Sequence, residues 1–167
     1  MNAMPPGAST TLTAHTPMTQ IGLNSHTPRI LIADDEPANL MLLEAFLKDY
    51  GEVLSIGESQ QVENAFLTFE PDILLLDLHM PEPDGLEILQ RLRSARASLG
   101  FLPVIVLTAD ITRVARNTAL LLGADDFLIK PLDRDDVVLR VRNLLRTRQL
   151  YSELLEANEA LRRQLQG

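Results

Sequence analysis

The hydrophobic pattern of the chain alternates between short, continuously apolar runs and longer segments whose apolar residues recur every three or four positions. The first pattern is typical of buried parallel strands and the second of amphipathic helices. Five strands that alternate with five helices predict an α/β fold, in which one parallel sheet is covered by helices on both faces. The expected strands are 29–34, 53–57, 72–78, 102–109 and 126–130, and the expected helices are 37–50, 59–70, 85–96, 110–123 and a long final helix after residue 133.

Polar residues and glycines mark the expected helix ends. Ser59, Asp84 and Asp133 each precede a helical pattern and are expected N-caps, because their side-chain oxygens can accept hydrogen bonds from free backbone N–H groups. Gly51 and Gly123 follow helical patterns as stop signals. These positions support the alternation of strands and helices.

Chemically active side chains gather at the ends of four expected strands. In an open parallel sheet, ligands bind beyond the carboxyl ends of the strands. We therefore expect three carboxylates, one hydroxyl and one ammonium at the same edge of the sheet. They follow the first strand (Asp34, Asp35), the third (Asp77), the fourth (Thr108, Ala109) and the fifth (Lys130, before Pro131).

The acidic side chains at this edge predict a metal site. Carboxylates packed together cannot all stay ionised without a cation. Mg²⁺ prefers oxygen ligands and commonly uses one or two carboxylates together with a phosphate. The chain has no Cys, which disfavours zinc and excludes disulfides. We expect Mg²⁺, with Mn²⁺ as the alternative.

Asp77 is the candidate nucleophile. A carboxylate can attack a phosphoryl group and form an aspartyl phosphate. Such a transfer needs mainly alignment and neutralisation of charge on the phosphoryl oxygens. We expect the metal to meet one of these oxygens, Lys130 a second, and the Thr108 hydroxyl with the Ala109 backbone N–H a third.

Four motifs resemble a known family. They are "ADDE" (33–36), "LLLDLHMPEPDGLE" (74–87), "VLTA" (106–109) and "GADDFLIKP" (123–131), and together they resemble the receiver domain of two-component response regulators over residues 29–147. The resemblance implies a flavodoxin-like sheet of order 2-1-3-4-5. It also implies that a histidine kinase or phosphotransfer protein supplies the phosphoryl group. The domain would be a signalling module whose only catalysis is its own phosphorylation and dephosphorylation.

The resemblance assigns roles to the acidic residues. Asp77 would be the phospho-acceptor, Asp35 and Asp77 would contact Mg²⁺ directly, and Asp34 would contact it through water. The backbone carbonyl of His79 would be the remaining protein ligand. For the His79 side chain two interpretations stay open: an exposed loop residue, or, with Asp110, a control on the access of hydrolytic water.

The resemblance also implies a conformational switch. Lys130 would pair with the phosphoryl group, and Lys130–Pro131 would be a cis peptide bond. After phosphorylation, Thr108 would move toward the phosphoryl group and Phe127 would rotate inward. Phe127 lacks a hydroxyl group, so it would act by packing only. This movement would change the surface formed by the fourth helix, fifth strand and fifth helix.

The two ends of the chain differ from its centre. Residues 1–28 are rich in Thr, Pro, Ala and Ser, and we predict a disordered tail. Residues 148–167 predict a helical coiled-coil extension, with Asn158 favouring a parallel homodimer. The alternative is an amphipathic tail that lies on its own domain or frays. The heptad places Val137, Leu144, Tyr151, Asn158 and Leu165 at a, and Arg140, Thr147, Leu154 and Leu161 at d.

Composition limits the remaining functions. The net charge of −8 argues against direct nucleic-acid binding over most of the surface. No apolar run approaches the roughly 20 residues of a membrane span, and the lack of Cys fits the cytoplasm. The extension resembles linkers to cyclic-dinucleotide synthases or phosphodiesterases, although no output domain is expected within these residues. Two competing interpretations are a flavodoxin-like FMN-binding protein and a degenerate receiver that serves only as a dimerisation scaffold.

Overall fold

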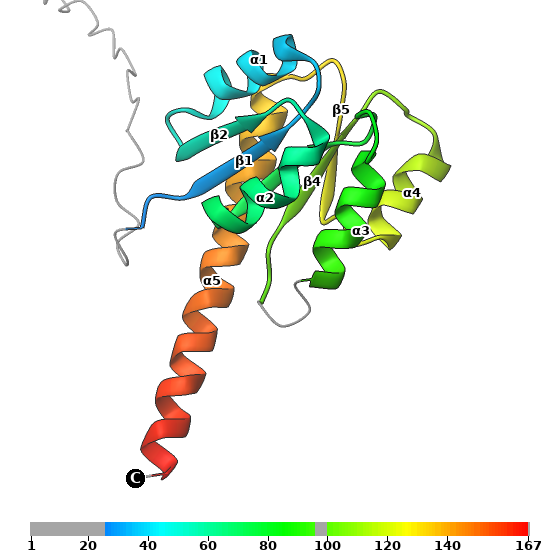
Figure 1. The fold of residues 1–167 in the computed structure, drawn as a ribbon. Coiled ribbons are helices and arrows are strands. Elements are labelled where there is room, and N and C mark those ends of the chain that lie inside the picture. Colours follow the sequence, from blue (N-terminus) through cyan, green and yellow to red (C-terminus); the bar gives the residue numbers. More distant parts are fainter. Residues whose placement is uncertain (1–25, 96–99, 167) are drawn as a thin grey trace, which may run out of the picture.

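The computed structural model describes residues 26–95 and 100–166, in which strands and helices alternate strictly (Figure 1). The predicted number of elements is confirmed. The strands are β1 (Arg29–Ala33), β2 (Glu52–Ile56), β3 (Ile73–Asp77), β4 (Val104–Thr108) and β5 (Asp126–Ile129), and the helices are α1 (Pro37–Leu47), α2 (Ser59–Phe69), α3 (Gly85–Ala95), α4 (Arg113–Leu121) and α5 (Arg134–Gln166).

All neighbouring strands are parallel, and their order is β2-β1-β3-β4-β5. The central strand β3 pairs Leu74 with Leu31 of β1 on one side and with Val104 of β4 on the other. Both β3 and β4 are buried throughout, as their continuous apolar sequences predict. The expected flavodoxin-like fold is therefore confirmed.

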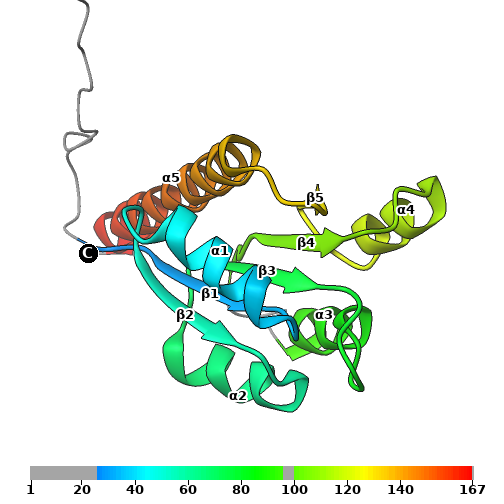
Figure 2. The same ribbon diagram turned by 90° about the horizontal axis from the view of Figure 1, so that it is seen from above.

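The sheet separates two hydrophobic layers, because successive side chains of a strand point to opposite faces. Leu74 and Leu76 of β3 pack into the layer beneath α2 and α3. Ile73 and Leu75 pack into the layer beneath α1 and α5. Figure 2 shows these two helix pairs on opposite sides of the sheet.

Local cap chemistry explains where two helices begin. The Asp84 carboxylate accepts the Glu87 N–H at 2.8 Å, and the Asp133 carboxylate accepts the Asp135 N–H at 3.0 Å. Both predicted caps are confirmed. Ser59 is not a cap: it is the first residue of α2, and its hydroxyl donates to the Glu82 carbonyl at 3.2 Å.

Helices α1 and α4 are shorter than their apolar patterns predict. Helix α1 ends at Leu47 rather than at residue 50, before a turn that leads into β2. Helix α4 begins at Arg113 rather than at residue 110, because the Thr112 hydroxyl accepts the Ala115 N–H and caps the helix there. The residues from Asp110 to Thr112 form a loop instead.

Helix α5 first packs on the domain and then leaves it. Val137 and Val141 are fully buried, and Leu144 packs against the same layer. The predicted heptad positions Val137 and Leu144 therefore face their own core and are not free to pair with another helix. The C-terminal part of the helix projects from the domain (Figure 1), and Leu154 and Leu161 are each 59% exposed.

The remaining expectations concern the chain ends and the membrane. Most of the predicted disordered tail lies outside the described residues. Pro28, its last residue, accepts the Glu52 N–H at 2.8 Å. Helix α5 is about 50 Å long, from its residue count and the helical rise, but no helix in the described parts of the chain is apolar enough to span a bilayer.

Candidate functional site

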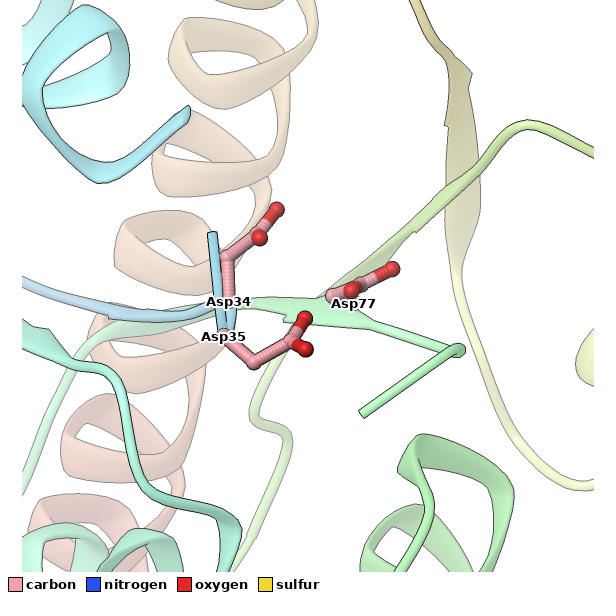
Figure 3. Close-up of side chains that lie close together, drawn as sticks. All are labelled: Asp34, Asp35 and Asp77. Atoms are coloured by element: carbon pink, nitrogen blue, oxygen red, sulfur yellow. The ribbon is translucent and has the colours of Figure 1, made fainter. Parts of the chain in front are cut away.

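Three aspartates meet at the carboxyl edge of the sheet. Asp34 and Asp35 follow β1, and Asp77 ends β3 (Figure 3). One carboxylate oxygen from each residue lies within 4.8 Å of the other two. Asp34 and Asp77 are buried, whereas Asp35 is exposed. The strand order thus brings together residues that lie 42 positions apart, counted from Asp35 to Asp77.

Lys130 is the cation of this cluster. Its Nζ lies 2.9 Å from Asp34 Oδ2 and 3.3 Å from Asp77 Oδ1. Burial alone would lower the pKa of Lys130, but the hydrogen bond to Asp34 and the charge of Asp77 outweigh it and raise this pKa. The Lys130–Pro131 peptide bond is cis, as the resemblance implies. The Glu82–Pro83 bond is also cis, which we did not expect.

Asp34 is held in place by the start of α1. Its carboxylate accepts the Glu36 N–H at 2.9 Å and the Asn39 side-chain amide at 3.1 and 3.3 Å. Sequence reasoning missed Asn39. Its position in the first turn of α1, five residues after Asp34, is the signal that could have identified it.

Asp77 is packed tightly at the end of β3. Burial raises the pKa of its carboxyl group, Asp34 raises it further, and the His79 backbone N–H and Lys130 act in the opposite direction. A Cβ atom at Gly85 would lie 2.1 Å from the Asp77 carbonyl oxygen, so only glycine fits there. The His79 backbone N–H lies 3.2 Å from Asp77 Oδ1, and the His79 side chain is exposed.

Thr108 and the loop after it form a chain of short-range hydrogen bonds. The buried Thr108 hydroxyl accepts the Asp110 N–H at 3.0 Å, and the Asp110 carboxylate accepts the Thr112 N–H at 2.7 Å. The Thr112 hydroxyl in turn caps α4. Ala109 lies between Thr108 and Asp110 in the sequence and is exposed. The end of β4 is therefore linked, hydrogen bond by hydrogen bond, to the first turn of α4.

Phe127 of β5 lies between two arginines. The guanidinium of Arg116 on α4 sits 4.3 Å from the ring centroid, and that of Arg140 on α5 sits 5.8 Å from it. Arg140 is itself held by Asp126 at 2.7 Å and Asp136 at 2.8 Å. Sequence reasoning did not identify Arg116, and it placed Arg140 in the heptad rather than against Phe127. Phe127 is half-buried, and its ring is in contact with cations from both flanking helices.

The family model of the response regulator receiver domain matches residues 30–142. Because this match covers more than half of the chain, the chain belongs to that family of two-component signalling proteins. The acidic cluster, Lys130 and Thr108 all lie within the matched residues. The family assignment made from the four sequence motifs is confirmed.

Individual relatives agree with this assignment. The chain is 36% identical over 139 residues to the transcriptional regulatory protein BaeR of Escherichia coli O6:H1, with 82% of this chain and 56% of that protein covered. It is 39% identical over 137 residues to the transcriptional regulatory protein TrcR of Mycobacterium tuberculosis, with 80% and 51% covered. The chain therefore spans about half the length of these curated relatives.

Solved structures show the same fold. A response regulator from Chloroflexus aurantiacus is 30% identical, with a TM-score of 0.66, and the match covers 72% of this chain and 98% of that one. A signal receiver domain from Vibrio parahaemolyticus is 23% identical, with a TM-score of 0.71, and the match covers 78% and 98%. The second likeness supports the fold alone.

The opposite pKa shifts of two aspartates give a test of the electrostatics. Asp77 binds its proton more tightly in the folded state, so its ionisation lowers stability as pH rises above the ordinary carboxyl pKa of 3.8. Without added metal at pH 7, Asp77→Asn should therefore raise the urea midpoint of unfolding. The gain should disappear in acid, below the pKa of the unfolded carboxyl group.

Asp72 is the matched control, because its pKa shift has the opposite sign. Burial would raise this pKa, but hydrogen bonds from the Arg29 backbone, His26 and Arg148 lower it. Its stabilisation is present at pH 7 and is lost as pH falls through the folded-state pKa. Asp72→Asn should therefore lower the midpoint at pH 7. Equal midpoints for the two variants would contradict this electrostatic account.

Proposed function

We propose that this chain is a phosphorylation-controlled switch in which Asp77 accepts a phosphoryl group from a histidine kinase or phosphotransfer protein. The observation that carries the proposal is the meeting of Asp77, two further aspartates and Lys130 at one sheet edge. Membership of the receiver family favours this function over the FMN-binding alternative. The domain's own chemistry would be limited to gaining and losing this group.

The transfer itself requires little from the protein beyond alignment. An oxygen of Asp77 forms a bond to phosphorus while the bond between phosphorus and the donor atom breaks, and the donor leaves with that electron pair. Lys130 exchanges its carboxylate partners for a phosphoryl oxygen. The Thr108 hydroxyl and the Ala109 backbone N–H donate to another oxygen, and movement of the hydroxyl toward it would displace the Asp110 N–H that this hydroxyl accepts.

The donor set at this edge fits a hard divalent cation, because it consists of carboxylate oxygens with no thiolate. Asp35 and Asp77 would hold Mg²⁺ or Mn²⁺ directly and Asp34 through water, with the His79 carbonyl as a further ligand. When bound, the ion neutralises negative charge on the phosphoryl oxygens.

Chemical phosphorylation tests this function. With acetyl phosphate and Mg²⁺, we expect one phosphoryl group per chain, located on Asp77 by reductive trapping and mass spectrometry. Asp77→Asn should abolish the modification, and Asp35→Asn should reduce it by at least about tenfold, because a direct ligand of the metal is lost.

Asp49→Asn is the matched control, because Asp49 is an exposed aspartate in the turn after α1, outside the acidic cluster. It should be modified like the unaltered protein. Modification that persists in Asp77→Asn, or that does not depend on a divalent cation, would show that the proposed chemistry is wrong.

We further infer that Arg116 holds Phe127 in its unphosphorylated position. A cation over an aromatic ring contributes about 0.5–2 kcal/mol, and the stack must break before the ring can turn inward. If the Phe127 ring turns inward on phosphorylation, removal of the Arg116–Phe127 stack shifts the conformational equilibrium toward the phosphorylated form. The hydrogen-bonded chain from Thr108 to α4 would couple the two movements, since Arg116 lies one turn into that helix.

Arg116→Gln should therefore increase the affinity for beryllofluoride, a phosphoryl analogue, by roughly two- to tenfold, which corresponds to about 0.5–1.4 kcal/mol. Titration followed by NMR of fluorinated phenylalanine would report both binding and the position of Phe127. Arg113→Gln, which alters an exposed arginine at the start of the same helix, is the control. An unchanged affinity in Arg116→Gln would refute the role given to this stack.

We also propose that the projecting part of α5 pairs with the same helix of a second copy. Leu154, Leu161 and Leu165 are exposed along this segment and recur at heptad spacing. Asn158 shares their seam, and among the described residues its amide donates only to the Leu154 carbonyl, so its oxygen can accept from a partner.

Replacing both Leu154 and Leu161 with Glu should convert the dimer into a monomer in sedimentation equilibrium, because paired acids would replace apolar contacts. Leu67→Glu, which alters an equally exposed leucine on α2, should leave the mass unchanged. An unaltered protein that sediments as a monomer at all concentrations would refute the dimer and would leave the phosphorylation chemistry untouched.

A further inference from the structure

Asp72 joins three separate parts of the chain at the end of the sheet opposite the acidic cluster. It precedes β3, whereas Asp77 ends this strand. The Asp72 carboxylate accepts the Arg29 backbone N–H at 2.9 Å and lies 2.8 Å from His26 Nε2. Its other oxygen accepts Arg148 Nε at 3.2 Å. Asp72 therefore ties the beginning of the described chain to the helix that leaves the domain.

Two residues of α5 make the contacts on the helix side. Arg148 binds Asp72 and also donates through Nη1 to the backbone carbonyl of Phe101. One turn later, the ring of Tyr151 packs edge-to-face on Phe101, with centroids 5.9 Å apart and planes inclined by 61°. An ionic contact and an aromatic contact thus converge on the residues that precede β3 and β4.

The environment makes these contacts stronger than ordinary surface pairs. The side chains of Asp72 and Arg148 are only 17% and 22% exposed. Partly buried charges are less screened by solvent than exposed ones, and Arg148 satisfies two acceptors with one guanidinium group. For residues 154–166, by contrast, the hydrogen bonds and ion pairs among the described residues stay within the helix.

We propose that Asp72, Arg148, Phe101 and Tyr151 form a clasp that fixes the direction in which α5 leaves the domain. The clasp goes beyond the proposed function, because none of its four residues belongs to the acidic cluster or contacts Lys130. It acts on the helix extension, and any structure joined to or paired with that extension receives a defined orientation relative to the sheet.

The clasp also determines which face of the extension stays free. Tyr151 faces its own domain, so the face that contains Arg148 and Tyr151 is occupied by contacts within the chain. Leu150, Leu154 and Leu161 are 55–59% exposed and lie outside these contacts. Release of the clasp would therefore free the angle at which the extension leaves the domain.

Pulsed electron paramagnetic resonance can test this directly. The chain has no Cys, so Lys48→Cys and Gln164→Cys allow spin labels to be placed on exposed positions of the domain and of the extension. Excess unlabelled protein would limit the signal to distances within one chain. The parent protein should give one narrow distance peak, and Arg148→Ala combined with Tyr151→Ala should lose it and give a broad distribution.

Arg146→Ala is the matched control, because Arg146 lies two residues from Arg148 and is exposed. It should retain the narrow peak. Tyr151→Phe, which keeps the ring, should also retain it, and Arg148→Lys, which keeps only the charge, should broaden it partly. These graded effects distinguish the clasp contacts from a general effect of substitution in α5.

Two further measurements separate the clasp from other causes. Far-ultraviolet circular dichroism must show unchanged helix content in the Arg148 and Tyr151 double variant, because the proposal concerns the direction of the helix and not its formation. Labelling of Asp77 by acetyl phosphate should be unchanged, so the two proposals can fail separately. A peak that stays narrow in the double variant, or a broad peak caused by melting of the extension, would overturn the clasp.

Discussion

Repulsion among three carboxylates at one edge of a buried sheet is the constraint on which the site depends. At 4 Å, two like charges repel by about 4 kcal/mol in an environment of intermediate polarity. Lys130 offsets only part of this, since its single positive charge pairs with Asp34 and Asp77, and the cluster holds three carboxylates. Burial is the main cause of the raised pKa of Asp77, and repulsion from Asp34 adds to it, against the opposing effects of the His79 N–H and Lys130. The surrounding fold must therefore supply the stability, through two apolar layers that hold the strand ends together.

Sequence reasoning predicted those features of the fold and the site that depend on neighbouring residues and on strand order. Continuous apolar runs identified β3 and β4, and right-handed crossovers between parallel strands then placed every strand end at one edge. Asp84 and Asp133 were predictable as caps, because a cap acts within three residues. Thr112 was missed because several polar residues precede α4, and pattern alone does not choose among them.

The contacts that could not be predicted involve long side chains from distant segments. Arg148 and Asp72 are 76 residues apart, and nothing in either local sequence specifies this pairing. The sequence pattern placed Arg140 only at a d position of the heptad and gave Arg116 no role, yet both lie over Phe127. Apolar periodicity indicates which face of a helix is buried. It does not indicate which partner a flexible cationic side chain at the edge of that face contacts.

Residues at both ends of the sheet contact α5, and they do so at different positions along the helix. Arg140 contacts Phe127, and Arg148 contacts Asp72 at the opposite end of the sheet, about 12 Å further along the helix. Strand β3, which connects Asp72 to Asp77, is buried throughout and packed on both faces, so it has little freedom to move. A movement of Phe127, if phosphorylation causes one as proposed, would therefore reach α5 through Arg140 rather than through β3. If Arg148 stays bound to Asp72, displacement of α5 near Arg140 would tilt the projecting segment. If Arg148 were released, the same displacement would merely loosen the helix.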